Sequence, residues 1–99
     1  MNNTYYELII SGKKERLLQL YIRLQDCLGK SNEITTERLG PKVISIYNIN
    51  GTTGILTRTQ DNDSTFVRLG LAGIDNHPLM DRIEKAHILF KDLNIQKNP

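Results

Sequence analysis

The chain has few of the residues that mark metal-binding or disulfide-rich proteins. Its 99 residues include one cysteine, Cys27, two histidines and no tryptophan. A lone cysteine excludes an internal disulfide framework and a zinc site built on cysteine pairs. His77 and His87 lie outside any HExxH pattern. We therefore predict no metal ligand set.

Long apolar runs are also missing. The longest, such as residues 8–10 and 86–90, fall far short of the roughly 20 residues that cross a bilayer. The first ten residues lack the basic and apolar regions of a secretory signal. We therefore expect no membrane partner, and a nuclear or cytoplasmic location.

Motifs that carry catalysis are absent in the same way. The segment 40–42 is too short to cradle a phosphate, and no serine lies in a nucleophile elbow. Paired carboxylates such as Asp81 and Glu84 are typical of helix ends and solvated surfaces. The sequence predicts no catalytic residue, no cofactor and no small-molecule substrate, so we expect the chain not to be an enzyme.

What is present is typical of one folded domain. Hydrophobic residues make up 38% and charged residues 24% of the sequence, as in ordinary globular proteins. A chain of this length holds one core, so we expect a single α/β domain over residues 1–99. The net charge of +2 is only slightly basic, without the dense positive charge of a stand-alone nucleic-acid-binding domain.

Periodicity predicts the elements of the first half. Residues 5–10 alternate as a strand, and 13–30 carry apolar residues at helical spacing up to the terminator Gly29. Residues 29–42 are predicted to form a loop. Two antiparallel strands, 42–49 and 54–59, then flank the hairpin signal Asn50-Gly51.

The second half is predicted to contain helices. Asp61, Asn62, Asp63 and Ser64 offer helix-capping oxygens before a helix over 64–74. In the final segment an apolar stripe over 79–93 also has helical spacing.

Residues from several of these segments carry a resemblance to a known family. Residues 42–74 resemble the small α/β protein subunits of ribonuclease P and RNase MRP, in which paired strands end in a glycine, two aliphatics and an arginine before an acidic, capped helix. Gly54, Ile55, Leu56 and Arg58 match that strand, with Thr57 inserted. Residues 77–82 and 88–93 look like the family's proline-led final strands. The missing Ser-Gly-Thr-Ile signature favours the diverged, smaller eukaryotic paralogue.

The resemblance implies a fold and a function. The fold would be an α+β sandwich of the RRM-like kind, with an antiparallel sheet, helices packed on one face and the order β-α-β-β-α-β. Residues 79–93 would then be largely extended, against their helical periodicity, so strand and helix both stay open for the last element. The function would be that of a nucleolar, non-catalytic subunit that braces RNA in precursor tRNA and rRNA processing, where RNA performs the cleavage.

The implied partners are structured RNA, larger protein subunits and a paralogous small subunit of the same particle. Lys13 and Lys14 oppose the dipole of their predicted helix, which favours an external anion, although a solvated basic face is the alternative. Leu18 and Ile22 fall beside the main apolar stripe and are candidates for a protein interface or for simple core-edge packing. The candidate RNA contacts are Lys13, Lys14, Arg16, Arg38, Lys42 and Arg58.

Besides an enzyme, which ranks last, two other readings of the sequence remain. One is a small subunit of a different ribonucleoprotein, such as the Alu end of the signal recognition particle. The other is a protein-only adaptor or homodimeric regulatory module without RNA. Salt dependence separates them, because phosphate binding weakens steeply with salt and an apolar interface does not.

Overall fold

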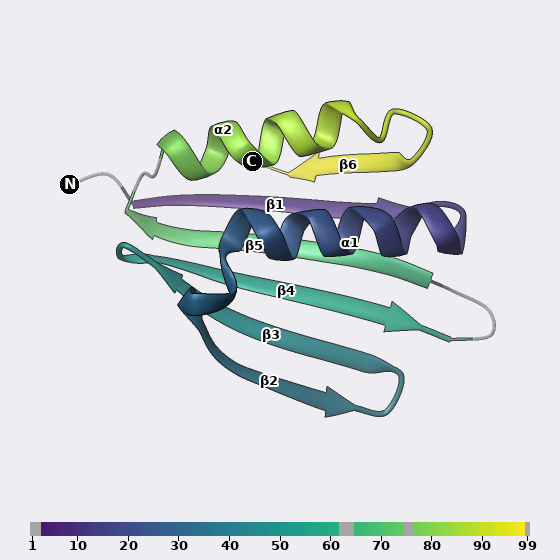
Figure 1. Ribbon diagram of the computed structural model, residues 1–99, viewed down its shortest axis with the longest axis horizontal. Coiled ribbons are helices and arrows are strands. Elements are labelled where there is room, and N and C mark those ends of the chain that lie inside the picture. Colours follow the sequence, from purple (N-terminus) through teal and green to yellow (C-terminus); the bar gives the residue numbers. More distant parts are fainter. Residues whose placement is uncertain (1–2, 62–64, 75–76, 99) are drawn as a thin grey trace.

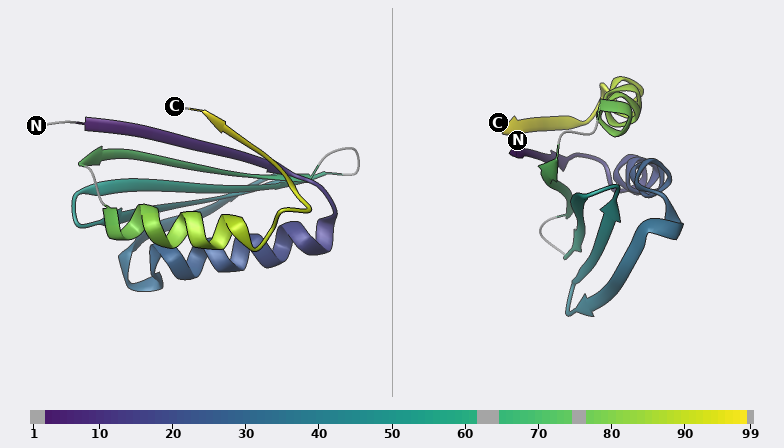
Figure 2. Two further views of the ribbon diagram at one scale, coloured as in Figure 1. Left: turned by 90° about the horizontal axis from the view of Figure 1, so that it is seen from above. Right: turned by 90° about the vertical axis from the view of Figure 1, so that its left-hand side faces the viewer.

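The computed structural model describes residues 3–61, 65–74 and 77–98. The elements follow in the order β1 (Asn3–Ser11), α1 (Lys14–Leu28), η1 (Lys30–Asn32), β2 (Glu33–Leu39), β3 (Lys42–Ile49), β4 (Thr52–Gln60), β5 (Thr65–Ile74), α2 (His77–Ile88) and β6 (Asn94–Asn98). The strands form one antiparallel sheet in the order β2-β3-β4-β5-β1-β6, shown in Figure 1. Figure 2 shows both helices on the same face of the sheet. The predicted fold class, an α+β sandwich, is confirmed.

The predicted order β-α-β-β-α-β is found when the hairpin β2–β3 is left out. β1, α1, β4, β5, α2 and β6 follow one another as β-α-β-β-α-β, and their strands lie in the order β6-β1-β5-β4. That is the arrangement of ferredoxin-like folds. The hairpin β2–β3 is inserted between α1 and β4 and extends the sheet next to β4.

The core lies between the sheet and the two helices. Strand alternation turns Tyr6, Leu8 and Ile10 of β1 towards the helices, and each of these side chains is at most 8% exposed. Residues Leu17, Leu20 and Leu24 of α1 meet them at helical spacing. The helix ends as predicted at Gly29, whose φ of +87° lies in the region that favours glycine.

The predicted helix over 64–74 is wrong, because residues 65–74 form β5. Val67, Leu69 and Leu71 alternate with Phe66, Arg68 and Gly70, and the first three are buried. Val67 and Leu71 are also four residues apart, which fits one face of a helix. Leu69, two residues from each, would lie on the opposite face of a helix, and it too is buried. β5 pairs with β1 on one side and β4 on the other, which fixes the extended form. The predicted capping residues at 62–64 lie outside the described residues.

The predicted loop over 29–42 is wrong for residues 33–39, which form the edge strand β2. Every residue of β2 is exposed, so the segment lacks the alternation that reveals a half-buried strand. Its β-branched Ile34, Thr35 and Thr36 are nonetheless strand formers. Gly40, at a φ of +60°, closes the turn to β3.

In the final segment, the helix predicted from apolar spacing is confirmed over α2. The extended form implied by the family resemblance is wrong for residues 79–88. Pro78 lies in the first turn, where its missing N–H costs nothing. Leu79, Ile83 and Ala86 are buried against the core. A turn region then leads to β6, which pairs with β1.

Gly70 and Gly73 of β5 differ in backbone conformation, so alanine substitutions at the two positions test the strand geometry. Gly73 has a φ of +118°, and an added Cβ would lie 2.8 Å from the Gly51 carbonyl oxygen. Gly73→Ala should lower the free energy of unfolding by roughly 1–3 kcal/mol, the usual cost of a strained backbone position. Urea denaturation measures this loss.

Gly70→Ala is the control, because an added Cβ there meets only the Tyr5 hydroxyl at 3.9 Å. We expect that variant to be neutral or to gain up to about 1 kcal/mol, since alanine restricts the unfolded chain. Equal losses in the two variants would contradict the strand geometry of β5.

Candidate binding surfaces

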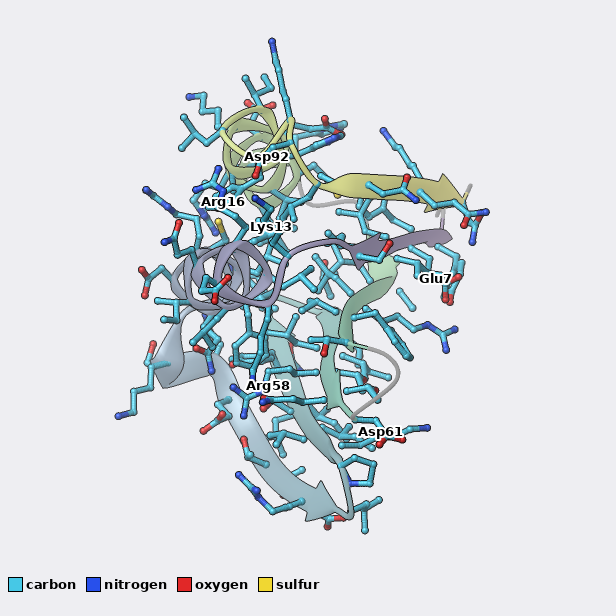
Figure 3. All side chains as sticks on the ribbon, turned by 90° about the vertical axis from the view of Figure 1, so that its right-hand side faces the viewer. Glu7, Lys13, Arg16, Arg58, Asp61 and Asp92 are labelled. Carbon is cyan, nitrogen blue, oxygen red and sulfur yellow. The ribbon has the colours of Figure 1, made fainter. Side chains whose placement is uncertain are left out.

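Five of the predicted RNA-contact residues lie at one end of the molecule, which we call the basic end: Lys13, Lys14, Arg38, Lys42 and Arg58. Lys14 and Arg58 line the same small hollow. Arg38 and Arg58 both pair with Val43, one from each side, so their strands are two spacings apart, about 9–10 Å. Lys42 starts β3 beside them. Figure 3 looks onto this end, with Lys13 near the start of α1 and Arg58 on β4.

Two of the arginines have well-defined aromatic neighbours. The Arg58 guanidinium stacks over the Tyr21 ring, 5.1 Å from its centroid. Stacking uses the face of the guanidinium and keeps its N–H donors in the plane at the edge. Arg58 is therefore held in place by α1.

Arg16, the sixth predicted RNA contact, has a different position. Its Nε and Nη2 donate to the two carboxylate oxygens of Asp92, each at 2.8 Å, and its guanidinium lies 4.5 Å from the centroid of Phe90. The Arg16 guanidinium lowers the pKa of the Asp92 carboxyl. Arg16 therefore clamps α1 to the turn after α2, and we do not count it in the basic end.

The predicted protein-interface residues lie next to the basic end. Leu18 is 43% exposed and Ile22 is 51% exposed, so neither is a core residue. Leu18 lines the hollow that Lys14 and Arg58 share. Ile22 follows one turn later on the same side of α1. The structure thus brings apolar and basic candidates together along one flank of α1.

A second surface is the sheet face turned away from the helices. Alternation places one set of apolar side chains here, which we call the open sheet face: Tyr5, Ile9, Ile44, Ile46, Ile55 and Phe66. Tyr5 and Ile55 are 54% and 43% exposed. Within the part of the chain that the structure describes, no element packs over this face (Figure 2).

A charged network crosses the same face. The Glu7 carboxylate accepts hydrogen bonds from Asn98 Nδ2 at 3.0 Å, from Tyr5 Oη at 2.8 Å and from Arg68 Nε at 2.8 Å. These donors stabilise the ionised form, with Asn98 contributing most, and lower the pKa of Glu7 from 4.5 to about 2. Glu7 therefore holds β6, β1 and β5 together as a carboxylate.

Sequence reasoning did not single out Glu7, its pairing with Arg68, or the residues of the open sheet face. A signal was present, because Glu7 and Arg68 each interrupt an otherwise apolar strand, and such charges need a partner. A second signal was that β1 carries apolar residues, Tyr5 and Ile9, on the face opposite its core residues as well. Both signals gain meaning only once β5 is known to lie beside β1.

No group of three or more His, Cys, Asp or Glu side chains with a described position could hold a metal ion. Cys27 is half-buried at the edge of the core, and burial raises the pKa of its thiol. Neither α1 nor α2, the two described α-helices, is long and apolar enough to span a membrane.

The chain was also compared with known proteins. No protein-family model and no curated protein sequence matches it. Among solved structures, it is similar to the adenosylmethionine decarboxylase of Aquifex aeolicus, with a TM-score of 0.42 and 8% identity over 99% of this chain and 91% of that one. A likeness this distant carries no argument about the activity of this chain.

The Glu7 network predicts a specific pH dependence. A carboxyl whose pKa is lowered by folding stabilises the protein above its unfolded pKa and loses that contribution as pH falls through the folded value. The difference in unfolding free energy between wild type and Glu7→Gln should thus be constant above about pH 5 and shrink between 4.5 and 2. Urea denaturation at a series of pH values measures it.

Asn98→Ala serves as the control, since it removes the donor that lowers the Glu7 pKa most. When Glu7→Gln is compared with Glu7 in chains that both carry Asn98→Ala, the difference in unfolding free energy should stop shrinking at a higher pH, because the folded pKa of Glu7 is lowered less. A gap that stays constant down to pH 2 would show that Glu7 is not held as an ionised partner.

Proposed function

We propose that the chain is a non-catalytic, RNA-bracing subunit of a ribonucleoprotein of the ribonuclease P or RNase MRP type. The observation that supports this is the basic end, where α1, β2, β3 and β4 together deliver five cationic side chains to one region. Phosphate contacts of this kind position RNA without reading its sequence. Catalysis would belong to the RNA, and the setting would be the nucleolus, where precursor tRNA and rRNA are processed.

The structure around the basic end suits a phosphate backbone. Lys13 precedes the first turn of α1, so its ammonium lies near the positive end of the helix dipole. Arg38 of β2 and Arg58 of β4 flank Val43 of β3, the strand between them. Such a row offers donors at several points along an RNA strand, which is what a bracing protein requires.

Protein partners would bind beside the RNA. Leu18 and Ile22 form an exposed apolar strip on α1 that continues from the basic end. A larger subunit of the particle, or a paralogous small subunit, would cover this strip while the RNA occupies the cationic groups. Apolar centres with charged rims are the usual anatomy of such interfaces.

A second function is favoured by the open sheet face. A protein-only adaptor or regulatory module would bind through apolar surface and would not need the basic end. Its binding should change little with salt, whereas RNA binding through five phosphates should weaken with a slope of about −4.5 in log K against log salt.

The RNA proposal predicts a measurable slope. Fluorescence anisotropy with labelled ribonuclease P RNA, between 50 and 300 mM KCl, should give a slope near that value. The double variant Arg38→Gln/Arg58→Gln should reduce its magnitude by about 2, since two phosphate contacts are lost.

The matched control is Lys30→Gln/Lys85→Gln, which removes two exposed lysines from η1 and α2. It lowers the net charge equally and should leave the slope almost unchanged. Equal effects of the two double variants would indicate diffuse charge attraction and contradict a defined RNA-binding end.

The protein-interface proposal has its own test. Ile22→Lys should reduce recovery of the larger ribonuclease P protein subunit with the tagged chain at least tenfold, because a charge is buried without a partner. Quantitative mass spectrometry of the purified particle measures recovery. Ile88→Lys, at a residue of α2 that is 58% exposed against 51% for Ile22, is the control and should leave recovery unchanged.

A further inference from the structure

The open sheet face has a composition that water alone does not explain. Antiparallel sheets with one solvated face usually carry polar side chains there. Here the two central strands and their neighbours carry Tyr5, Ile9, Ile55 and Phe66 on that side, together with the threonines Thr53, Thr57 and Thr59. An apolar patch spread across several strands marks an interaction surface rather than a solvent face.

Gly70 adds an independent observation at the middle of this face. It pairs with Ile55 of β4 and Glu7 of β1. Its backbone does not have a positive φ, and an added Cβ would meet nothing closer than the Tyr5 hydroxyl at 3.9 Å. Neither conformation nor internal packing therefore requires glycine, although glycine weakens a strand interior. Close approach by another molecule is one physical reason for a bare backbone here.

The missing side chain leaves a hollow over Gly70. Its volume is about 220 Å³, and Tyr5, Ile55 and Ala72 provide apolar walls. A cavity of about 150 Å³ already holds a benzene ring, so this hollow has room for an inserted side chain. Tyr5 and Ile55 beside it are 54% and 43% exposed, and the Tyr5 hydroxyl is hydrogen-bonded to Glu7. One patch thus contains both exposed apolar side chains and a recess.

The charges on this face cancel. The strand side chains that share it include two acidic groups, Glu7 and Glu37, and two basic groups, Lys42 and Arg68. Glu7 and Arg68 are bonded to each other. A second copy of the same face would therefore meet no net repulsion, although the whole chain has a charge of +2.

The size of the face also suits association with a second copy. Six strands at a spacing of about 4.8 Å and a rise of about 3.3 Å per residue give a face of roughly 700–900 Å². A standard stable interface buries about 800 Å² on each partner. An isologous dimer needs one self-complementary patch of this size.

We propose that the open sheet face is the interface of a homodimer, in which two copies stack sheet on sheet with Tyr5 and Ile55 of each copy packed at the hollow over Gly70 of the other. The sheets would lie about 10 Å apart with the helices on the outside. Of the basic end, only Lys42 lies on this face, at its margin. Dimerisation and RNA binding therefore use largely separate residues and can be tested separately.

The test is sedimentation velocity of the purified full chain, without RNA, from 1 to 200 μM. We expect a concentration-dependent shift from an 11.3 kDa monomer to a particle of twice that mass, 22.6 kDa. Ile55→Lys should raise the dissociation constant at least 100-fold, because two charges enter an apolar interface. Leu18→Lys is matched, since both residues are 43% exposed, and should leave dimerisation unchanged.

A second variant tests the same interface in case Ile55→Lys fails to fold. Gly70→Leu fills the hollow from within and should raise the dissociation constant at least tenfold while circular dichroism stays native. Raising salt from 0.1 to 1 M should not dissociate the wild-type dimer. A chain that is monomeric throughout the range, including one that binds only a different protein through this face, would overturn the proposal. So would a dimer lost in Leu18→Lys but kept in both open-face variants.

Discussion

The pairing of β5 with both β1 and β4 is the constraint on which the rest of the structure depends. β5 joins the N-terminal strand to the strands from the middle of the chain, in a register that runs along its full length. Its inward residues Val67, Leu69 and Leu71 are almost completely buried and belong to the core between the sheet and the helices. Its outward residues Arg68 and Gly70 define the centre of the open sheet face.

The parts of the fold that sequence predicts well are those in which one face alone is buried. α1 and β1 each repeat their apolar residues at a single period, so local pattern and tertiary burial agree. α2 is similar, and there the local pattern was a better guide than the family resemblance, because Leu79 and Ile83 face the core from a helix. The fold class follows from these elements together.

The parts that sequence predicts poorly lack a unique local period. β2 is exposed on both faces, so burial leaves no pattern in it. β5 contains Val67 and Leu71 at helical spacing, and only pairing with distant strands decides against a helix. The basic end has the same limit: its residues were identifiable as cations, but their assembly depends on the hairpin register that places Arg38 and Arg58 around Val43. Arg16 differs because Asp92, its partner, is remote in sequence.

The two proposed surfaces are compatible because the two-layer architecture separates them. The helices cover one sheet face, which leaves the other face apolar and available, while the basic end occupies the edge formed by the start of α1 and the turn between β2 and β3. A dimer stacked through the open sheet face would carry two basic ends on one rigid body. An RNA that reached both would bind the second end at a high effective concentration, so moderate charge at each end would suffice. This gives a physical reason why a bracing protein can function with a net charge of only +2 per chain.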